Sequence, residues 1–222
     1  MFTKENVKQF PNIIIKTPKK KEKVMLVKKN SDIFVPRYSD TLFWCFYIIE
    51  NDWSEYYMVG RHHFQIEKNK KISYIEKIRT LKEKLKVHKF KIAEIENDLL
   101  NNRYIQSKTF IALCILHNIN VIVIFNNHYY YEYMDGAGEP HIIRQEKKEF
   151  GLCLKKNVHT IKEELSSYWK IENIHKPLKG ISTYKVGALK KICKKLKIDM
   201  YKDASRMHNK TQLYNLIRLK IE

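Results

Sequence analysis

Closely spaced cysteine pairs are missing from this chain. Its four cysteines, Cys45, Cys114, Cys153 and Cys193, lie far apart and form no Cys-x-x-Cys pair. Structural zinc modules need closely spaced ligand pairs, so no metal is expected here, and no motif predicts a cofactor. Apolar residues surround Cys45 and Cys114, and the first residues do not resemble a secretory signal. The cysteines are therefore expected to be reduced thiols of an intracellular protein.

Long hydrophobic runs are also missing. A membrane-spanning helix requires roughly 20 consecutive apolar residues, and no stretch of the sequence approaches that length, so no membrane span is expected. A hydrophobic content of 44% with 30% charged residues is typical of a globular protein. The 222 residues are enough for one ordinary core and one small appendage.

Acidic residues are scarce relative to basic ones. There are 24 Asp and Glu against 43 Lys and Arg, which gives a formal net charge of +19. So large an excess makes nucleic acid or another anionic surface the expected partner. Part of it can reflect coding bias, because abundant Lys, Asn, Ile and Tyr are typical of an AT-rich genome. A large DNA virus would fit that composition, and the expected location is then the nucleus, a viral factory or a virion.

The most apolar stretch runs over residues 39–52, and it predicts a buried helix. Ser39 or Asp40 can cap the first turn, because either side chain offers an oxygen to an unpaired backbone N–H. Cys45 would then lie in the second turn. Two roles remain open for it: a packing thiol, or a nucleophile whose pKa is lowered near the helix start.

The next part of the chain predicts mixed secondary structure. Aromatic and β-branched residues over 56–66 favour a short strand, and apolar residues at three- and four-residue steps predict a long helix over 72–100. Ser107 is expected to cap a helix over 108–117 that leads into a buried strand over 119–125.

A turn at Asn126 and Asn127 would then reverse the chain into a strand over 128–134, because Asn tolerates positive φ. A loop over 135–138 and a third strand over 141–145 would complete a meander. Helix, strand and meander predict an α+β domain over 31–155, preceded by a basic extended arm over 1–30 and followed by a linker with a short helix over 156–180.

The domain over 31–155 resembles papain-like cysteine peptidases. The segment FIALCILHNINVIVIF is similar to a helix and strand of the ovarian-tumour (OTU) type deubiquitinases. That resemblance implies a helix bearing a nucleophilic Cys packed on a sheet, with a His base. Cys45 would be the nucleophile, His128 the base, and Asp135 or Glu139 the orienting carboxylate. The chain departs from the OTU pattern in the catalytic motif, because Leu42 stands where that family carries an Asp three residues before the Cys. A degenerate peptidase-like fold that serves as a scaffold is therefore the preferred interpretation.

The segment over 181–222 resembles a SAP motif, the small two-helix module of chromatin and DNA-repair proteins. Ser182 and Thr183 are expected to cap the first helix, and a loop over 199–209 would join it to the second. The matching positions are Leu189, Leu196, Ile198, Lys210, Leu213 and Ile217. Lys197 stands where the family usually carries Gly, and the loop is longer than usual. The resemblance implies binding to duplex DNA with little base-specific readout.

Charge supports that resemblance independently. Residues 176–222 carry thirteen Lys and Arg against three acidic residues, so more than half of the excess charge lies in the last fifth of the chain. A module this small must concentrate that charge on its surface. The residues expected to contact DNA phosphates are Lys185, Lys190, Lys191, Lys194, Lys195, Lys197, Arg206, Lys210 and Arg218.

The sequence therefore predicts a DNA-associated, non-enzymatic protein with an α+β scaffold and a C-terminal SAP-like module. Two alternatives stay open. One is a cysteine peptidase or deubiquitinase that uses Cys45 and His128. The other is a structural virion or assembly protein, in which the C-terminal module docks onto a protein partner.

Overall fold

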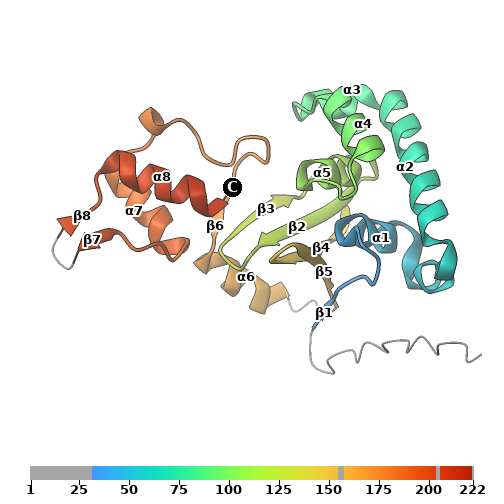
Figure 1. Ribbon diagram of the computed structural model, residues 1–222, viewed down its shortest axis with the longest axis horizontal. Coiled ribbons are helices and arrows are strands. Elements are labelled where there is room, and N and C mark those ends of the chain that lie inside the picture. The colour runs from blue at the N-terminus through green and yellow to red at the C-terminus, as the bar shows by residue number, and fades with distance from the viewer. Residues whose placement is uncertain (1–31, 155–157, 204–205, 222) are drawn as a thin grey trace, which may run out of the picture. The chain divides into compact units, whose positions relative to one another are not determined.

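The computed structural model describes residues 32–154, 158–203 and 206–221, and it is a mixed α+β protein (Figure 1). The expected arm over 1–30 lies outside the described residues. A six-stranded sheet has the strand order β1-β5-β4-β2-β3-β6. Its strands are β1 (Ile33–Phe34), β2 (Ile119–Phe125), β3 (Tyr129–Tyr133), β4 (Ala137–Glu146), β5 (Glu149–Cys153) and β6 (Trp169–Lys170). In the described part of the chain, no helix has both the length and the hydrophobicity needed to cross a bilayer.

Helix α1 (Thr41–Met58) is buried against the sheet, as its apolar sequence predicts. Residues 41–48 are all buried, and Asp40 caps the helix by accepting a hydrogen bond from the backbone N–H of Phe43 at 3.2 Å. The expected strand over 56–66 is wrong. Its first residues complete α1, the short 3₁₀ turn η1 (Gly60–His62) follows, and helix α2 (His63–Thr80) begins directly afterwards. The aromatic ring of Tyr56 is buried in the core instead of lying on a strand.

The single helix expected over 72–100 is divided into three. Helices α2, α3 (Lys82–Val87) and α4 (Ile92–Asn101) are separated at Leu81 and at Lys89, which has a φ of 61°. The chain folds back so that α2 and α4 are joined by an Arg79–Glu96 ion pair of 2.8 Å. A signal for the break is present in the sequence, because Leu85, Phe90 and Ile95 are five residues apart and five-residue steps leave a helical face.

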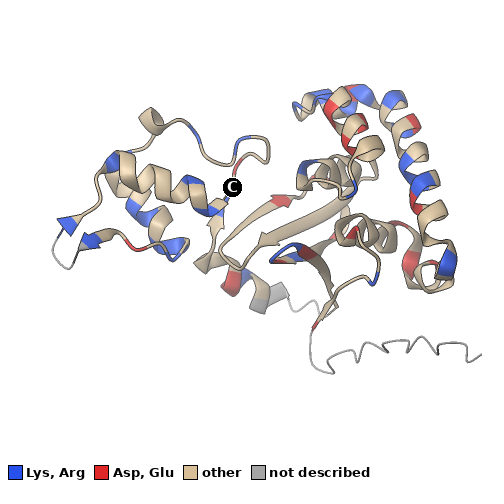
Figure 2. Cartoon of the chain, in the orientation of Figure 1, with Lys and Arg blue, Asp and Glu red and all other residues tan. Residues whose placement is uncertain are grey.

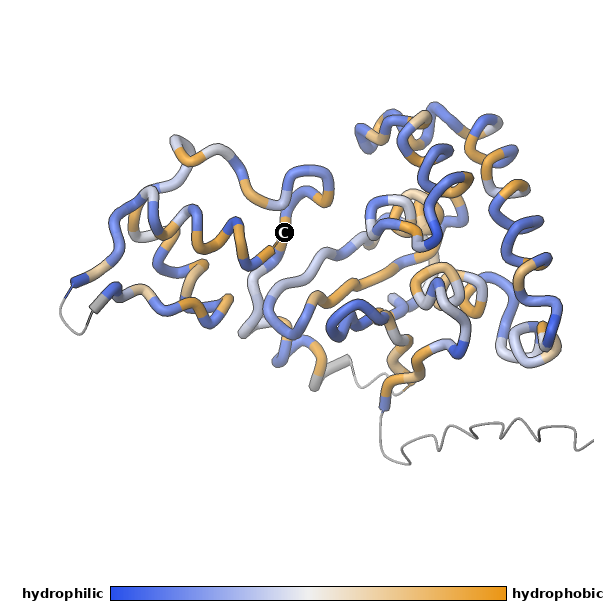
Figure 3. The backbone as a smooth tube through the Cα atoms, viewed as in Figure 1, coloured by the Kyte–Doolittle hydropathy of each residue, from blue (hydrophilic) through white to orange (hydrophobic). Residues whose placement is uncertain are grey.

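Helix α5 (Ser107–Leu116) leads into β2, the most continuously hydrophobic strand (Figure 3). Asn126 and Asn127 have φ values of 47° and 56°, so the tight turn before β3 forms as expected. The capping role expected for Ser107 is wrong. The side chain of Asp98, on α4, covers the helix start instead, accepting hydrogen bonds from the backbone N–H of Gln106 at 2.8 Å and from the Thr109 hydroxyl.

The expected meander is also wrong, because β4 pairs in parallel with β2 on the side opposite β3. The connection after β3 must therefore cross the start of β2. Gly136 permits this crossing, since a Cβ atom there would lie 2.6 Å from the carbonyl oxygen of Asn118. The Asn120 side chain secures it, accepting from the Gly136 N–H and donating to the Gly138 carbonyl oxygen, both at 2.7 Å.

The second face of the sheet is covered by α6 (Val158–Ser167), within the segment expected to be a linker. Ile161, Leu165 and Tyr168 form a core there with Ile122, Ile124, Ile142 and Cys153. Strand β6 then joins the edge of β3. The sheet domain thus continues to Lys170, beyond the boundary expected at residue 155, because the apolar face of a two-sided sheet must be covered by another element.

The C-terminal part contains the 3₁₀ turn η2 (Ile181–Thr183), helix α7 (Val186–Lys195), a small hairpin of β7 (Tyr201–Asp203) and β8 (Arg206–Met207), and helix α8 (Lys210–Ile221). The two expected helices are both present. The expected loop over 199–209 contains the hairpin, whose base is closed by a backbone hydrogen bond from the N–H of His208 to the carbonyl oxygen of Met200 at 2.9 Å.

Candidate nucleic-acid interface

The two C-terminal helices pack on each other through apolar side chains that are continuous with the main buried cluster of the protein. The fully or nearly buried side chains of this part are Leu189, Ile192, Cys193, Leu196, Leu213 and Ile217. They recur at three- and four-residue steps, so each helix turns one face inward and leaves the other for charged residues. The matching positions Leu189, Leu196 and Leu213 are completely buried. Four of the six residues that carry the SAP resemblance, Ile217 included, are therefore packing residues, while Ile198 and Lys210 are half-buried.

Lys197 ends α7 in a conformation that glycine usually adopts. Its φ is 54°, in the left-handed region, and the N–H of Ile198 donates back to the carbonyl oxygen of Cys193 at 2.9 Å. A left-handed residue just after a helix, followed by such a backward hydrogen bond, is the common glycine-type helix ending. The departure from the SAP pattern at Lys197 thus changes the residue but keeps the backbone conformation that the family's Gly would supply.

The residues at the starts of α7 and α8 differ in their capping roles from those expected from the sequence. Ser182 and Thr183 do not cap α7, because they lie in η2, and the Thr183 hydroxyl donates to the Gly180 carbonyl oxygen at 2.7 Å. Helix α7 begins after Lys185 without a side-chain cap. Helix α8 has a reciprocal cap: Asn209 accepts from the N–H of Gln212 at 2.9 Å, and Gln212 accepts from the N–H of Asn209 at 3.0 Å.

Three of the expected DNA-contacting lysines share one face of α7. Lys194 is three residues from Lys191 and four from Lys190, and the three lysines point away from the buried side formed by Leu189, Ile192 and Cys193. Basic residues recur along α7 and through the rest of the C-terminal part (Figure 2). We call these three residues the α7 lysine face. Lys195 is turned aside, because its ammonium group donates to the carbonyl oxygen of Tyr168 at 2.9 Å. Because the three lysines already lie on one side of α7, they can face a phosphate backbone without any rearrangement of the helix.

The other expected contacts lie around this face and do not belong to it. Lys185 precedes α7, and Lys197 follows its last turn. Arg206 is on β8, and Lys210 and Arg218 are at the start and near the end of α8, about 12 Å apart along the helix at 1.5 Å per residue. The nine residues are thus spread over the module.

In the part of the chain that the structure describes, the α7 lysine face brings cations without acidic partners together on one side of a helix. Among the described residues, none of its lysines forms a salt bridge. Several cations of the sheet domain are neutralised, for example Lys71 by Asp40 at 3.1 Å and Lys108 by Glu94 at 3.3 Å, while Lys68 and Lys82, which lie apart from each other, form no salt bridge among the described residues. Unpaired like charges within one helical turn produce a positive potential that a polyanion can neutralise.

The residues expected to act as a peptidase are not brought together. Cys45 is completely buried, its thiol donates to the carbonyl oxygen of Phe150 on β5 at 3.8 Å, and burial raises the pKa of the thiol far above its usual range. His128 lies in the turn before β3, three strands away from β5 in the sheet, or roughly 14 Å at the usual strand spacing. Asp135 and Glu139 lie beyond the opposite end of β3.

This arrangement disfavours nucleophilic catalysis. A working Cys needs a base within hydrogen-bond reach and a lowered pKa, and Cys45 has neither in the described structure. Its position on the packed face of α1 instead fits the packing role that the sequence left open.

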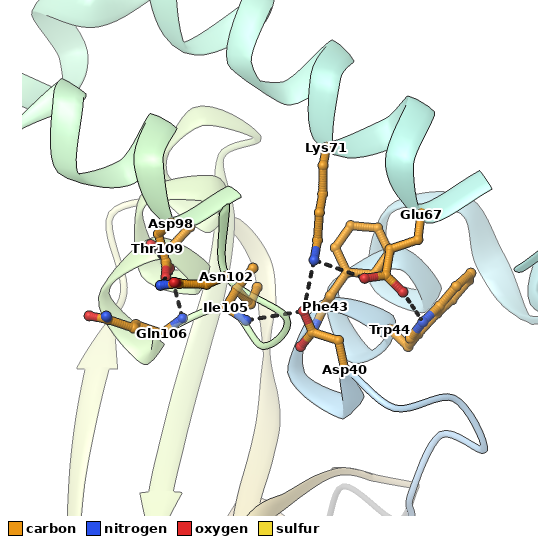
Figure 4. Close-up of polar contacts among 10 residues, drawn as sticks. All are labelled: Asp40, Phe43, Trp44, Glu67, Lys71, Asp98, Asn102, Ile105, Gln106 and Thr109. Carbon is orange, nitrogen blue, oxygen red and sulfur yellow. Dashed lines mark hydrogen bonds and ion pairs between the residues drawn. The ribbon is translucent and has the colours of Figure 1, made fainter. Parts of the chain in front are cut away.

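The best organised polar cluster was not foreseen from the sequence (Figure 4). Asp40 accepts from the ammonium of Lys71 at 3.1 Å and from the backbone N–H of Ile105 at 3.0 Å, while Glu67 accepts from Lys71 at 2.8 Å and from the Trp44 indole at 3.1 Å. Burial alone would lower the pKa of Lys71, but Glu67 and Asp40 raise it, so the lysine stays charged. The cluster ties α1, α2 and the loop before α5 together, which is a structural role.

Comparison with protein-family models, with curated proteins and with solved structures finds no significant match. The function is therefore inferred from the residues and geometry described above.

Proposed function

We propose that this protein binds duplex nucleic acid, most simply DNA, through phosphate contacts of its C-terminal module, while the sheet domain serves as a scaffold. The observation that carries the proposal is the α7 lysine face, with three exposed or half-exposed cations that lack acidic partners in the described structure. Each ammonium placed near a phosphate releases a condensed counterion, which is the main source of sequence-independent affinity. Lys185 precedes α7 and Lys197 follows it, which adds two more cations near the ends of the helix.

The resemblance to SAP modules supports the same proposal. Two helices pack through the positions that match the family, and Lys197 adopts the backbone conformation of the glycine it replaces. Contacts to phosphates position a protein on a duplex but carry no sequence information. The proposed binding is therefore expected to depend strongly on salt and weakly on sequence.

A matched pair of triple variants of the full chain tests this proposal. The first neutralises the α7 lysine face by Lys190→Gln, Lys191→Gln and Lys194→Gln. The control neutralises three exposed lysines of the sheet domain, Lys68, Lys82 and Lys162, which lowers the net charge equally. Lys and Gln have similar helix propensity, so neither change should unfold its helix.

Binding to a fluorescein-labelled blunt duplex is measured by anisotropy over a range of salt concentrations. Loss of three phosphate contacts should reduce the slope of log affinity against log salt by roughly 2.7, from about 0.9 per contact. The control should keep the wild-type slope. Equal losses in both variants would show that only bulk charge matters, and an unchanged slope in the first variant would refute the proposed interface.

A further inference from the structure

A cavity of about 440 Å³ lies beside α7, between the end of the sheet and the C-terminal module. Two aromatic residues line it, Trp169 of β6 and Tyr184, which precedes α7. Lys170, Lys176 and Lys179 line the same cavity, together with the single acidic residue Glu172, and the remaining lining residues are Asn173, Pro177 and Ile192. Aromatic rings next to lysines are the combination that proteins use to bind unpaired nucleotides.

The backbone of Trp169 and the hydroxyl of Tyr184 are both anchored by hydrogen bonds. The backbone N–H of Trp169 donates to the carbonyl oxygen of His128 at 3.0 Å, and β6 pairs with β3. The hydroxyl of Tyr184 accepts a hydrogen bond from the backbone N–H of Lys179 at 3.1 Å. A ring whose backbone or hydroxyl is already anchored loses little freedom when a base stacks on it, which favours binding.

The cations of the cavity are not equivalent. Lys170 pairs with Glu132, and Lys179 pairs with Glu172. Lys176 is exposed and has no salt bridge to a described acidic residue, so its charge is available to a ligand phosphate. One free ammonium beside two rings matches the needs of a single nucleotide, with a flat base and one phosphate.

We propose that this cavity binds one unpaired nucleotide of a strand that continues from the duplex held by the α7 lysine face. The base stacks on Trp169 and Tyr184, and the phosphate contacts Lys176. This inference rests on the proposed function and adds a substrate class to it, namely duplexes that carry a single-stranded tail. Ile192 lines the cavity from the inward side of α7, so a strand that leaves the α7 lysine face must pass round the helix, which is roughly 10 Å across, to reach the cavity.

The test measures affinity of the full chain for a blunt duplex and for the same duplex with a short 5′ or 3′ tail. One stacked base should increase affinity about 5- to 150-fold for at least one tail. Trp169→Leu should remove that gain and leave blunt-duplex affinity unchanged. Trp169→Phe keeps an aromatic ring and should retain most of it.

Tryptophan fluorescence gives a second readout with the tailed duplex. Trp44 is completely buried, and Trp53 of α1 packs edge-on against Phe34, so quenching on binding should come mainly from Trp169 and should be largely absent in Trp169→Phe. Equal affinity for blunt and tailed duplexes overturns this inference while the proposed function stands. Equal loss on both in Trp169→Leu also overturns it, since the residue would then be merely structural. Failure of the wild type to bind the blunt duplex counts against the proposed function itself.

Discussion

The crossing of the β3–β4 connection over the start of β2 depends on one side chain, Asn120, and replacing it with Ala should destabilise the sheet. Asn120 is 6% exposed and makes two hydrogen bonds of 2.7 Å, one to the Gly136 N–H and one to the Gly138 carbonyl oxygen. Each such bond contributes about 1 kcal/mol net, and the exposed Gly138 carbonyl can recover a partner from water. We therefore expect Asn120→Ala to lower the free energy of unfolding by about 2 kcal/mol.

Urea denaturation followed by circular dichroism measures that loss as a lower midpoint at an unchanged slope, and a melting curve should shift by roughly 4–8 °C. Asn101→Ala is the matched control. Asn101 is exposed at the end of α4 and bonds only to Asn97 in the described structure, so its loss should change stability by less than about 0.5 kcal/mol. Equal effects of the two substitutions would refute the role assigned to Asn120.

Three further outcomes are expected. Lys197→Gly should stabilise the protein by about 1 kcal/mol in urea denaturation, because it relieves a left-handed residue, whereas Lys194→Gly in α7 should destabilise it by a similar amount. Hydrogen bonds from Arg144 lower the pKa of Glu164, so the stabilisation they provide should be complete above about pH 5 and lost as pH falls through that lowered pKa. In urea denaturation at a series of pH values, Glu164→Gln should therefore cost about 1–2 kcal/mol at pH 7 and progressively less as the pH falls through the lowered pKa. The neighbouring substitution Glu163→Gln should cost little throughout. All four cysteines are buried, so Ellman's reagent should label none of them rapidly until guanidinium unfolds the chain, and rapid labelling of Cys45 in the folded protein would revive the peptidase alternative.

Local patterns predicted local structure well. The hydrophobic run of α1, the strand β2, the Asn126–Asn127 turn and helix α8 each follow from residues close together in the chain. The order of the strands could not be predicted in the same way. The strand order depends on a close approach between Gly136 and Asn118, which are eighteen residues apart. A single glycine in a loop does not indicate which distant backbone segment it will contact.

Only the part of the candidate interface that depends on local spacing was predicted from the sequence. Helical spacing is enough to place Lys190, Lys191 and Lys194 on one face. The hydrogen bond that turns Lys195 toward Tyr168 could not be foreseen, because it joins α7 to the end of α6 through tertiary packing. Trp169 was missed as a possible ligand contact because β6 is only two residues long and carries no periodic signal.

The unpaired state of the α7 lysine face also governs how this part of the fold responds to ionic strength. In the free protein, Lys190, Lys191 and Lys194 repel one another, and dissolved ions shield that repulsion. Exposed pairs such as Arg79–Glu96 are attractive, so the same ions weaken them. Rising salt should therefore reduce the repulsion within α7 while it weakens the exposed ion pairs of the sheet domain. A bound polyanion would reduce the repulsion within α7 in the same way, because its own charges neutralise the three lysines.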